Sequence, residues 1–207
     1  MEYASRGAIV LAGGPSERLG RPKALVRFGG VPLVLRAASA AFAVSEDVVV
    51  VSRGPLAGQI QEILFAGPRV VRDQMRARSP LVGLLAGAEA LRTETVAAIA
   101  CDLPFIRPSL LSRLFREARG HDAAVPRWPD GRVEPLVAVY RRVALLRALR
   151  SSLAAGDRSN LAMLARLRDV RFVPVGSLRS LDPGLRSFVN VNTPRDLARA
   201  RRLAPRS

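Results

Sequence analysis

The sequence predicts an α/β fold in which a mostly parallel sheet is covered by helices on both faces. Short apolar, β-branched runs alternate with segments of helical period along the chain, as in strand–helix–strand units. The first runs are apolar throughout, which is typical of strands buried on both faces. A length of 207 residues suits one hydrophobic core, so we expect a single domain over residues 1–207.

The individual elements follow from the same periodicities and from local start signals. Strands are expected at residues 8–12, 48–52, 69–72, 96–101, 123–126 and 133–140, with weaker signals at 171–175 and 188–191. Helices are expected at residues 32–42, 56–65, 80–91, 108–119, 143–149, 157–167 and 194–202. Pro32 and Pro194 suit the first turn of a helix, and Thr193 suits an N-cap. Residues 127–132 contain Asp-Gly and predict a turn.

The formal charge of +16 raises the question of nucleic-acid binding. The basic residues are spread along the chain, with no block and no interleaved aromatic residues. A solvated basic surface is therefore the favoured interpretation, and a nucleic-acid partner is not expected. The charge would still attract a small polyanionic substrate.

Several features bear on the compartment and on the classes of chemistry. The single cysteine, Cys101, cannot form an internal disulfide and suits a reducing cytosol. No apolar run reaches the ~18 residues needed to cross a bilayer, so we expect a cytoplasmic protein without a membrane partner. His121 is the only histidine, which leaves neither a His/Cys zinc cluster nor a Ser-His-Asp triad.

A glycine loop follows the first predicted strand, where residues 11–23 read LAGGPSERLGRPK. Gly13 and Gly14 let backbone N–H groups approach an anion without a Cβ in the way, and Arg18 adds positive charge. The loop has neither the G-x-G-x-x-G nor the G-K-[ST] pattern. A tight strand-to-helix turn would also explain the glycines. Lys23 favours the phosphate interpretation, because it is the only lysine among 33 basic residues and an ammonium contacts one phosphate oxygen as a point charge.

Asp102 lies just past the predicted strand at residues 96–101. In α/β sheets, ligands bind at the carboxyl ends of parallel strands. A carboxylate there can hold Mg²⁺ that bridges phosphate oxygens. The alternative is an N-cap for the helix beginning near Pro108, but the spacing is long for a simple cap.

Residues 188–197 read FVNVNTPRDL and contain two of the three asparagines of the chain. Asn190 and Asn192 flank one valine, so in an extended strand both amides face the same way. They could coordinate a metal or bind polar substrate groups. Turn and cap chemistry before Pro194 is the alternative, although Thr193 already supplies a cap.

These motifs resemble those of the molybdenum cofactor guanylyltransferases, within the nucleotidyltransferase superfamily. The family pattern L-A-G-G-x-S-x-R-M-G-x-x-K-x-L matches residues 11–25, with Leu19 in place of methionine. C-D-x-P-F matches residues 101–105, and F-x-N-V-N-T-P-E-D-L matches residues 188–197, with Arg195 in place of glutamate.

Two further segments also resemble the family. Residues 79–83 resemble G-P-L-A-G, but Ser79 and Val82 are bulkier than the family residues. Asp73 lies before this segment and corresponds to an aspartate that helps to hold the nucleotide; an ordinary solvated carboxylate is the alternative. Residues 132–140 resemble the acceptor-side segment R-x-E-P-L-x-A-x-Y, although a plain strand accounts for Glu134 as well.

The resemblance implies a Rossmann-like nucleotidyltransferase domain that uses Mg²⁺ to transfer GMP from GTP to the terminal phosphate of molybdopterin or its metal-loaded form. Cofactor delivery proteins and target molybdoenzymes are further implied partners. The implied catalytic residues are Lys23, Arg18 and Asp102, with Mg²⁺ on Asp102. The implied nucleotide contacts are Leu11, Ala12, Gly13, Gly14, Lys23, Asp73 and Asp102. The implied substrate contacts are Gly20, Gly83, Asn190 and Asn192.

Two alternatives stay open at this point. One is cytidylyl or other nucleotidyl transfer to a related phosphorylated acceptor, although LAGG in place of LAAG favours guanine. The other is a non-catalytic nucleotide-binding module on the same fold. Lys23 and Asp102 are both present, which argues against the second alternative.

Overall fold

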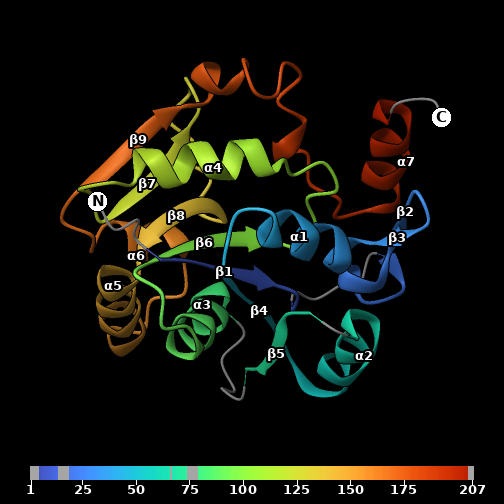
Figure 1. The fold of residues 1–207 in the computed structure, drawn as a ribbon, viewed down its shortest axis with the longest axis horizontal. Helices are drawn as coiled ribbons and strands as arrows, with labels where there is room; N and C mark the ends of the chain where they lie inside the picture. The colour runs from blue at the N-terminus through green and yellow to red at the C-terminus, as the bar shows by residue number, and fades with distance from the viewer. Residues whose placement is uncertain (1–4, 14–18, 66, 74–78, 205–207) are drawn as a thin grey trace.

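The computed structural model describes residues 5–13, 19–65, 67–73 and 79–204, and its centre is a seven-stranded sheet (Figure 1). The strand order is β5-β4-β1-β6-β8-β7-β9. The strands are β1 (Arg6–Leu11), β4 (Asp47–Ser52), β5 (Arg69–Arg72), β6 (Thr95–Ala100), β7 (Ala123–Arg127), β8 (Val137–Arg141) and β9 (Val170–Pro174). Only β8 runs antiparallel to its neighbours in this sheet, so the predicted mostly parallel sheet is confirmed.

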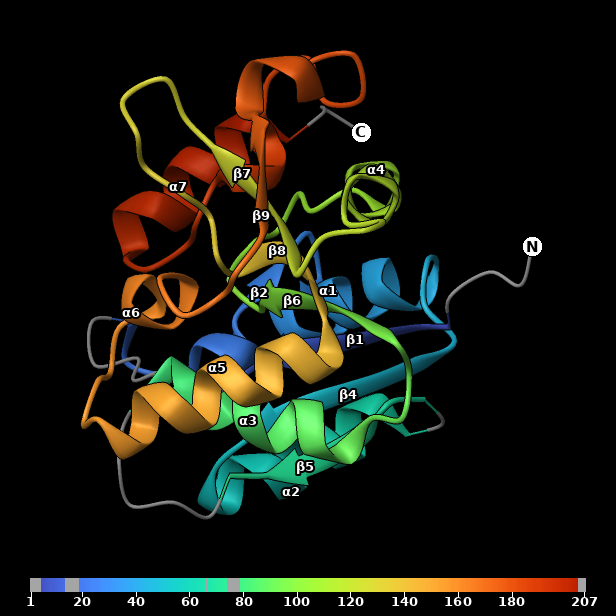
Figure 2. The ribbon, with the colours of Figure 1, turned by 90° about the vertical axis from the view of Figure 1, so that its left-hand side faces the viewer.

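Helices cover both faces of the sheet, as predicted (Figures 1 and 2). One face carries α1 (Leu33–Phe42), α2 (Gly54–Leu64) and α4 (Pro108–Glu117). The other carries α3 (Pro80–Ala90), α5 (Arg142–Ala154) and α6 (Asn160–Leu164), with α3 and α5 side by side. Successive strand residues point to opposite faces, so Val10 packs in the first layer and Ile9 in the second. None of the described helices is both long and apolar enough to span a bilayer.

Glycines on α3 allow this helix to lie close to the central strand β1. A Cβ on Gly87 would lie 2.6 Å from Ile9 Cγ2, and one on Gly83 would lie 3.0 Å from Leu11 Cδ2. Larger residues would push the helix away from the sheet. The start of α3 is thereby held beside the carboxyl end of β1.

The C-terminal helix α7 (Pro194–Leu203) packs beside a short hairpin formed by β2 (Arg27–Phe28) and β3 (Val31–Pro32) (Figure 1). The predicted cap is confirmed: Thr193 Oγ1 accepts a hydrogen bond from the Asp196 N–H (3.1 Å), and Asp196 Oδ2 accepts one from the Thr193 N–H (2.9 Å). Pro194 occupies the first turn. Pro32, in contrast, is the N-cap of α1 and not a first-turn residue.

The weak strand prediction at residues 188–191 is wrong. Arg186–Phe188 form a 3₁₀ turn, and Leu185 adopts the left-handed region with φ of 50°. The buried Asp182 holds this turn, with its Oδ2 accepting a hydrogen bond from the Ser187 N–H (2.7 Å). The Ser187 hydroxyl then donates to the Phe105 carbonyl (3.3 Å), which ties the turn to the loop after Asp102.

Two other elements are shorter than predicted. The strand expected from residue 133 begins at Val137, because Pro135 has no N–H and the Glu134 N–H donates to the Pro126 carbonyl (3.0 Å). The helix expected at residues 157–167 covers only Asn160–Leu164, with Ser159 Oγ as its N-cap acceptor. The Asp-Gly turn at residues 127–132 is confirmed, with the Trp128 N–H donating to the Arg132 carbonyl (2.8 Å).

Candidate nucleotide-binding site

A cavity of about 530 Å³ lies at the carboxyl ends of β1, β4 and β6. Its volume is within the range of small-molecule sites, and parallel sheets bind ligands at this edge. It is lined by Leu11, Gly13, Lys23, Val51, Ser52, Arg53, Asp73, Ser79, Pro80, Gly83, Ala100, Cys101, Asp102 and Leu136. The cavity therefore collects residues from most of the motifs that the sequence singles out.

Lys23 joins two distant motifs at this cavity. Its Nζ donates to Asp102 Oδ2 at 3.0 Å and to Asn192 Oδ1 at 2.5 Å. The ammonium and carboxylate are mostly shielded from water, with side-chain exposures of 16% and 14%. Partial burial lowers the local dielectric and strengthens such a pair relative to one on the surface. The only lysine, the strand-end aspartate and one asparagine thus form one polar cluster.

The backbone fixes the position of Asp102. The Cys101 N–H donates to the Leu11 carbonyl (3.1 Å), and the Val191 N–H donates to the Asp102 carbonyl (2.9 Å). The N-cap of α4 is Arg107, so Asp102 does not cap that helix. Val191 is fully buried against the hairpin and α7, which anchors the asparagine motif beside Asp102.

The donor set at Asp102 fits a magnesium ion that is shared with a phosphate ligand. Asp102 Oδ1 is buried without a hydrogen-bond partner among the described residues. Nowhere in the part of the chain that the structure describes, Asp102 included, do three His, Cys, Asp or Glu side chains form a metal-binding group. Mg²⁺ is commonly held by one or two carboxylates, substrate phosphates and water. One carboxylate beside a lysine suits that arrangement better than a metal cage made by the protein alone.

Asp73 is a buried cavity residue. Its side chain is only 4% exposed, and its Oδ2 accepts hydrogen bonds from Arg53, with Nε at 2.6 Å. The Asp73 N–H donates to the Ser52 carbonyl (2.9 Å), which holds the end of β5 against the end of β4. The solvated-loop alternative for Asp73 is therefore wrong.

Arg53 and Ser52 are cavity residues that the sequence interpretation missed. Ser52 is fully buried, and its hydroxyl has no hydrogen-bond partner among the described residues. Both residues lie at the carboxyl end of β4, at the edge that drew attention to Asp102 and Asp73. Applying the strand-end rule to every predicted strand would have found them.

The glycine loop is described only in part. Gly14 and Arg18 lie outside the described residues. Leu11 and Gly13 line the cavity, and a Cβ on Gly13 would lie 3.6 Å from Arg53 Cγ. Ala12 is buried, and its N–H donates to the Val51 carbonyl (2.8 Å).

The remaining predicted substrate contacts are placed differently. Gly83 lines the cavity, where it also allows α3 to pack on Leu11. Gly20 is exposed in a turn with φ of 65°, a conformation that favours glycine. Asn190 and Asn192 are both exposed, and Asn192 also contacts Lys23. The expectation that both amides face one way required a strand that is absent from this described segment.

Two side chains around the site have mainly structural contacts. Ser79 caps α3 by accepting a hydrogen bond from the Leu81 N–H (3.2 Å), and it donates one to the Arg158 carbonyl (3.0 Å). These two bonds account for a serine at this position, where the family pattern has glycine. Burial and the adjacent Asp102 charge raise the pKa of Cys101 to about 12. A thiol that stays protonated is a poor nucleophile, and Cys101 packs in the hydrophobic core.

A mostly parallel α/β sheet, with a lysine suited to phosphate and a strand-end aspartate that line one cavity, defines a nucleotide-binding domain of the nucleotidyltransferase type. Residues 8–170 match the family model described as MobA-like NTP transferase domain. The chain belongs to this family.

Relatives over nearly the whole chain carry consistent names. A probable molybdenum cofactor guanylyltransferase of Methanosarcina mazei is 38% identical and covers 93% of this chain and 88% of its own. The molybdenum cofactor guanylyltransferase of Desulfosudis oleivorans is 33% identical, with coverages of 93% and 92%. The crystal structure of molybdopterin-guanine dinucleotide biosynthesis protein A from Archaeoglobus fulgidus superposes with a TM-score of 0.82 at 29% identity and covers 95% of this chain and 97% of its own.

Proposed function

We propose that this protein transfers GMP from GTP to the terminal phosphate of molybdopterin and releases pyrophosphate. The pairing of Lys23 with Asp102 in the wall of one cavity, with Asn192 Oδ1 accepting from the same ammonium, carries the proposal. Phosphoryl-type transfer asks a protein mainly for positioning and for charge neutralisation. The names of the relatives supply the guanine and molybdopterin parts of the proposal.

GTP would occupy the cavity with its nucleoside toward Ser52 and its phosphates toward Lys23. The buried Ser52 hydroxyl has no hydrogen-bond partner among the described residues, and Asp73, oriented by Arg53, offers carboxylate oxygens to base or ribose N–H and O–H groups. A site built from such groups rejects ligands that leave them unpaired. Asn192, Gly83 and Gly20 would lie on the acceptor side of the phosphates.

Mg²⁺ would be held by Asp102 together with phosphate oxygens of the nucleotide, and it would neutralise part of their charge when bound. Lys23 would donate from its present position to a phosphate oxygen. An oxygen of the acceptor phosphate attacks the α-phosphorus in line, while the bond between that phosphorus and the oxygen bridging to the β-phosphate breaks. Pyrophosphate leaves, and no general base is required because the attacking phosphate is already ionised.

The decisive experiment measures pyrophosphate release with each of the four nucleoside triphosphates, with and without molybdopterin. We expect acceptor-dependent release with GTP that clearly exceeds release with CTP or ATP, together with a dinucleotide product detected by mass spectrometry. Equal or greater activity with CTP would assign the chain to cytidylyl transfer instead. Nucleotide binding without turnover of any of them would make it a non-catalytic module.

The setting of the reaction is also part of the proposal. We infer a cytoplasmic single-domain enzyme, since its one cysteine is a buried free thiol and so suits a reducing compartment. Delivery proteins that bring the molybdenum cofactor and molybdoenzymes that receive the product are the protein partners implied by the reaction.

A further inference from the structure

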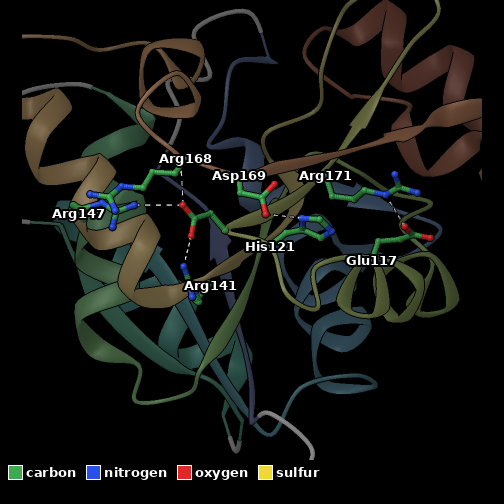
Figure 3. A network of polar contacts seen from close by, with 8 residues as sticks. Glu117, His121, Arg141, Arg147, Arg168, Asp169 and Arg171 are labelled. Carbon is green, nitrogen blue, oxygen red and sulfur yellow. Dashed lines mark hydrogen bonds and ion pairs between the residues drawn. The ribbon is translucent and has the colours of Figure 1, made fainter.

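The amino edge of the sheet, opposite the cavity, has its own polar network (Figure 3). Asp122 lies just before β7, and its side chain is only 2% exposed. Its carboxylate accepts hydrogen bonds from the Arg141 side chain, from Arg147 Nη2 (3.3 Å) and from the Arg168 N–H (3.0 Å). These bonds join the end of β8, helix α5 and the segment before β9, so this edge is firmly held.

Beside this network lies a surface hollow of about 350 Å³. It is lined by Arg113, Arg116, Glu117, Arg119, His121 and Arg171. The residues come from the end of α4, from the turn that follows it and from the start of β9. The reaction proposed above uses none of them.

Glu117 orients two of the arginines at the hollow. It accepts hydrogen bonds from Arg113 Nε (2.8 Å) and from Arg171 Nε (3.1 Å). Burial by itself would raise the pKa of Glu117, but these bonds outweigh it and hold the pKa below its usual value. Glu117 is therefore ionised, and the guanidinium groups are set in place before a ligand arrives. At the rim, His121 Nδ1 lies 2.9 Å from Asp169 Oδ2 (Figure 3).

The lining determines which ligand chemistry fits. Four arginines against Glu117 and the rim carboxylate of Asp169 leave a net positive charge. The lining has no Phe, Tyr, Trp or aliphatic side chain, and its one ring, His121, lies with Nδ1 2.9 Å from Asp169 Oδ2. It therefore lacks the row of stacking rings that is typical of a nucleic-acid groove. Exposed pairs between guanidinium groups and anions are individually weak, so a single small anion gains little here. Several carboxylates on one segment would add their contributions and match the fork geometry of arginine.

We propose that this hollow, at the edge of the sheet opposite the candidate active site, docks an acidic segment of a partner protein. Docking at this edge leaves the cavity accessible to nucleotide and acceptor while the partner is bound. The proposal does not depend on which nucleotide the cavity takes.

A fluorescent hepta-glutamate peptide is the probe for the test. Its affinity is measured by anisotropy as a function of salt, and its position is mapped by ¹H–¹⁵N NMR shifts. The test variant is Arg116→Glu with Arg119→Glu. The control is Arg92→Glu with Arg201→Glu, which changes the charge equally at exposed positions outside the hollow.

We expect shifts around residues 113–121 and 171, at least tenfold weaker peptide binding in the test variant and less than twofold weakening in the control. Pyrophosphate release should be unchanged in both. If the test variant unfolds, Arg116→Ala with Arg119→Ala replaces it. This replacement is also expected to weaken peptide binding more than the control does.

Three results would overturn the proposal. Equal weakening in the two variants would mean a nonspecific charge effect. Displacement of the peptide by equimolar inorganic pyrophosphate would mean a small-anion site. Tighter binding of a uridylate heptamer through the same arginines would mean a nucleic-acid site.

Discussion

The two edges of the sheet use charge in different ways. At the carboxyl edge, Lys23, Asp102 and Asp73 have side chains that are 4–16% exposed and lie around a deep cavity. At the amino edge, Arg113 and Arg171 are 41% and 53% exposed around a smaller hollow without apolar lining. The amino edge has more charged groups. Its acids Asp122 and Glu117 are shielded, with side chains 2% and 16% exposed, but its arginines around the hollow are more exposed than the groups at the cavity.

The comparison indicates that shielded charges around a cavity identify the reaction site better than the number of charges does. A charge shielded from water interacts strongly with a bound phosphate, because the local dielectric is low. An exposed guanidinium is screened by water and salt, so it contributes mainly to association between larger surfaces. Four substitutions test this difference.

Asp102→Asn should cause the largest loss. An amide binds Mg²⁺ far more weakly than a carboxylate, so we expect kcat to fall on the order of 10³-fold. Pyrophosphate release at saturating Mg²⁺ measures the loss, and an unchanged melting temperature shows that the fold is intact. Retention of most of the activity would exclude Asp102 as the metal ligand.

Lys23→Arg should cost on the order of 10²-fold in kcat, with a smaller change in GTP affinity. The ammonium fits between Asp102 and Asn192 as a point donor, and the longer planar guanidinium would misplace that donor. Steady-state kinetics of Lys23→Arg and Lys23→Ala, measured side by side, separate the effect of misplacing the positive charge from the effect of removing it. A wild-type kcat for Lys23→Arg would mean that the lone lysine has no special role.

Asn192→Ala should reduce kcat about tenfold, because Asn192 Oδ1 accepts from Lys23 and so orients it. If Asn192 acts through Lys23, the double variant with Lys23→Ala should be little worse than Lys23→Ala alone. Fully additive losses in this cycle would show that Asn192 acts separately, for example on the acceptor.

Asp122→Asn should reduce stability and leave turnover unchanged. Loss of the charged acceptor is expected to cost roughly 1–3 kcal/mol in unfolding free energy at pH 7. Urea unfolding measures this cost, and pyrophosphate release serves as the control. A loss of activity without a loss of stability would contradict the division of roles between the two edges.

The same variant should show a defined pH dependence. Burial alone would raise the pKa of Asp122, but hydrogen bonds from the Arg168 N–H and the Arg141 side chain outweigh it and lower the pKa. The stabilisation is therefore fully present above the unfolded-state pKa of about 3.9 and is lost as pH falls below it through the folded-state pKa. The stability gap between wild type and Asp122→Asn should close in that acidic range.

The sequence by itself determined the features that depend on neighbouring residues. Apolar periodicity located β1, β4 and β6, and the sequence Thr193-Pro194 located the start of α7, because periodicity and capping act within a few residues. Asp102 could be assigned to the ligand-binding edge because the end of a buried strand is readable from the sequence.

Only the tertiary structure decided which distant residues meet. Lys23 and Asn192 are 169 positions apart, and no local pattern pairs them; the packing of Val191 against the hairpin and α7 brings the asparagine to the lysine. The Arg53–Asp73 pair likewise requires β4 and β5 to be neighbours. Near the strand expected at residues 188–191, Ser187 bonds locally to the buried Asp182 and at long range to the Phe105 carbonyl, and such contacts can outweigh a weak local strand preference.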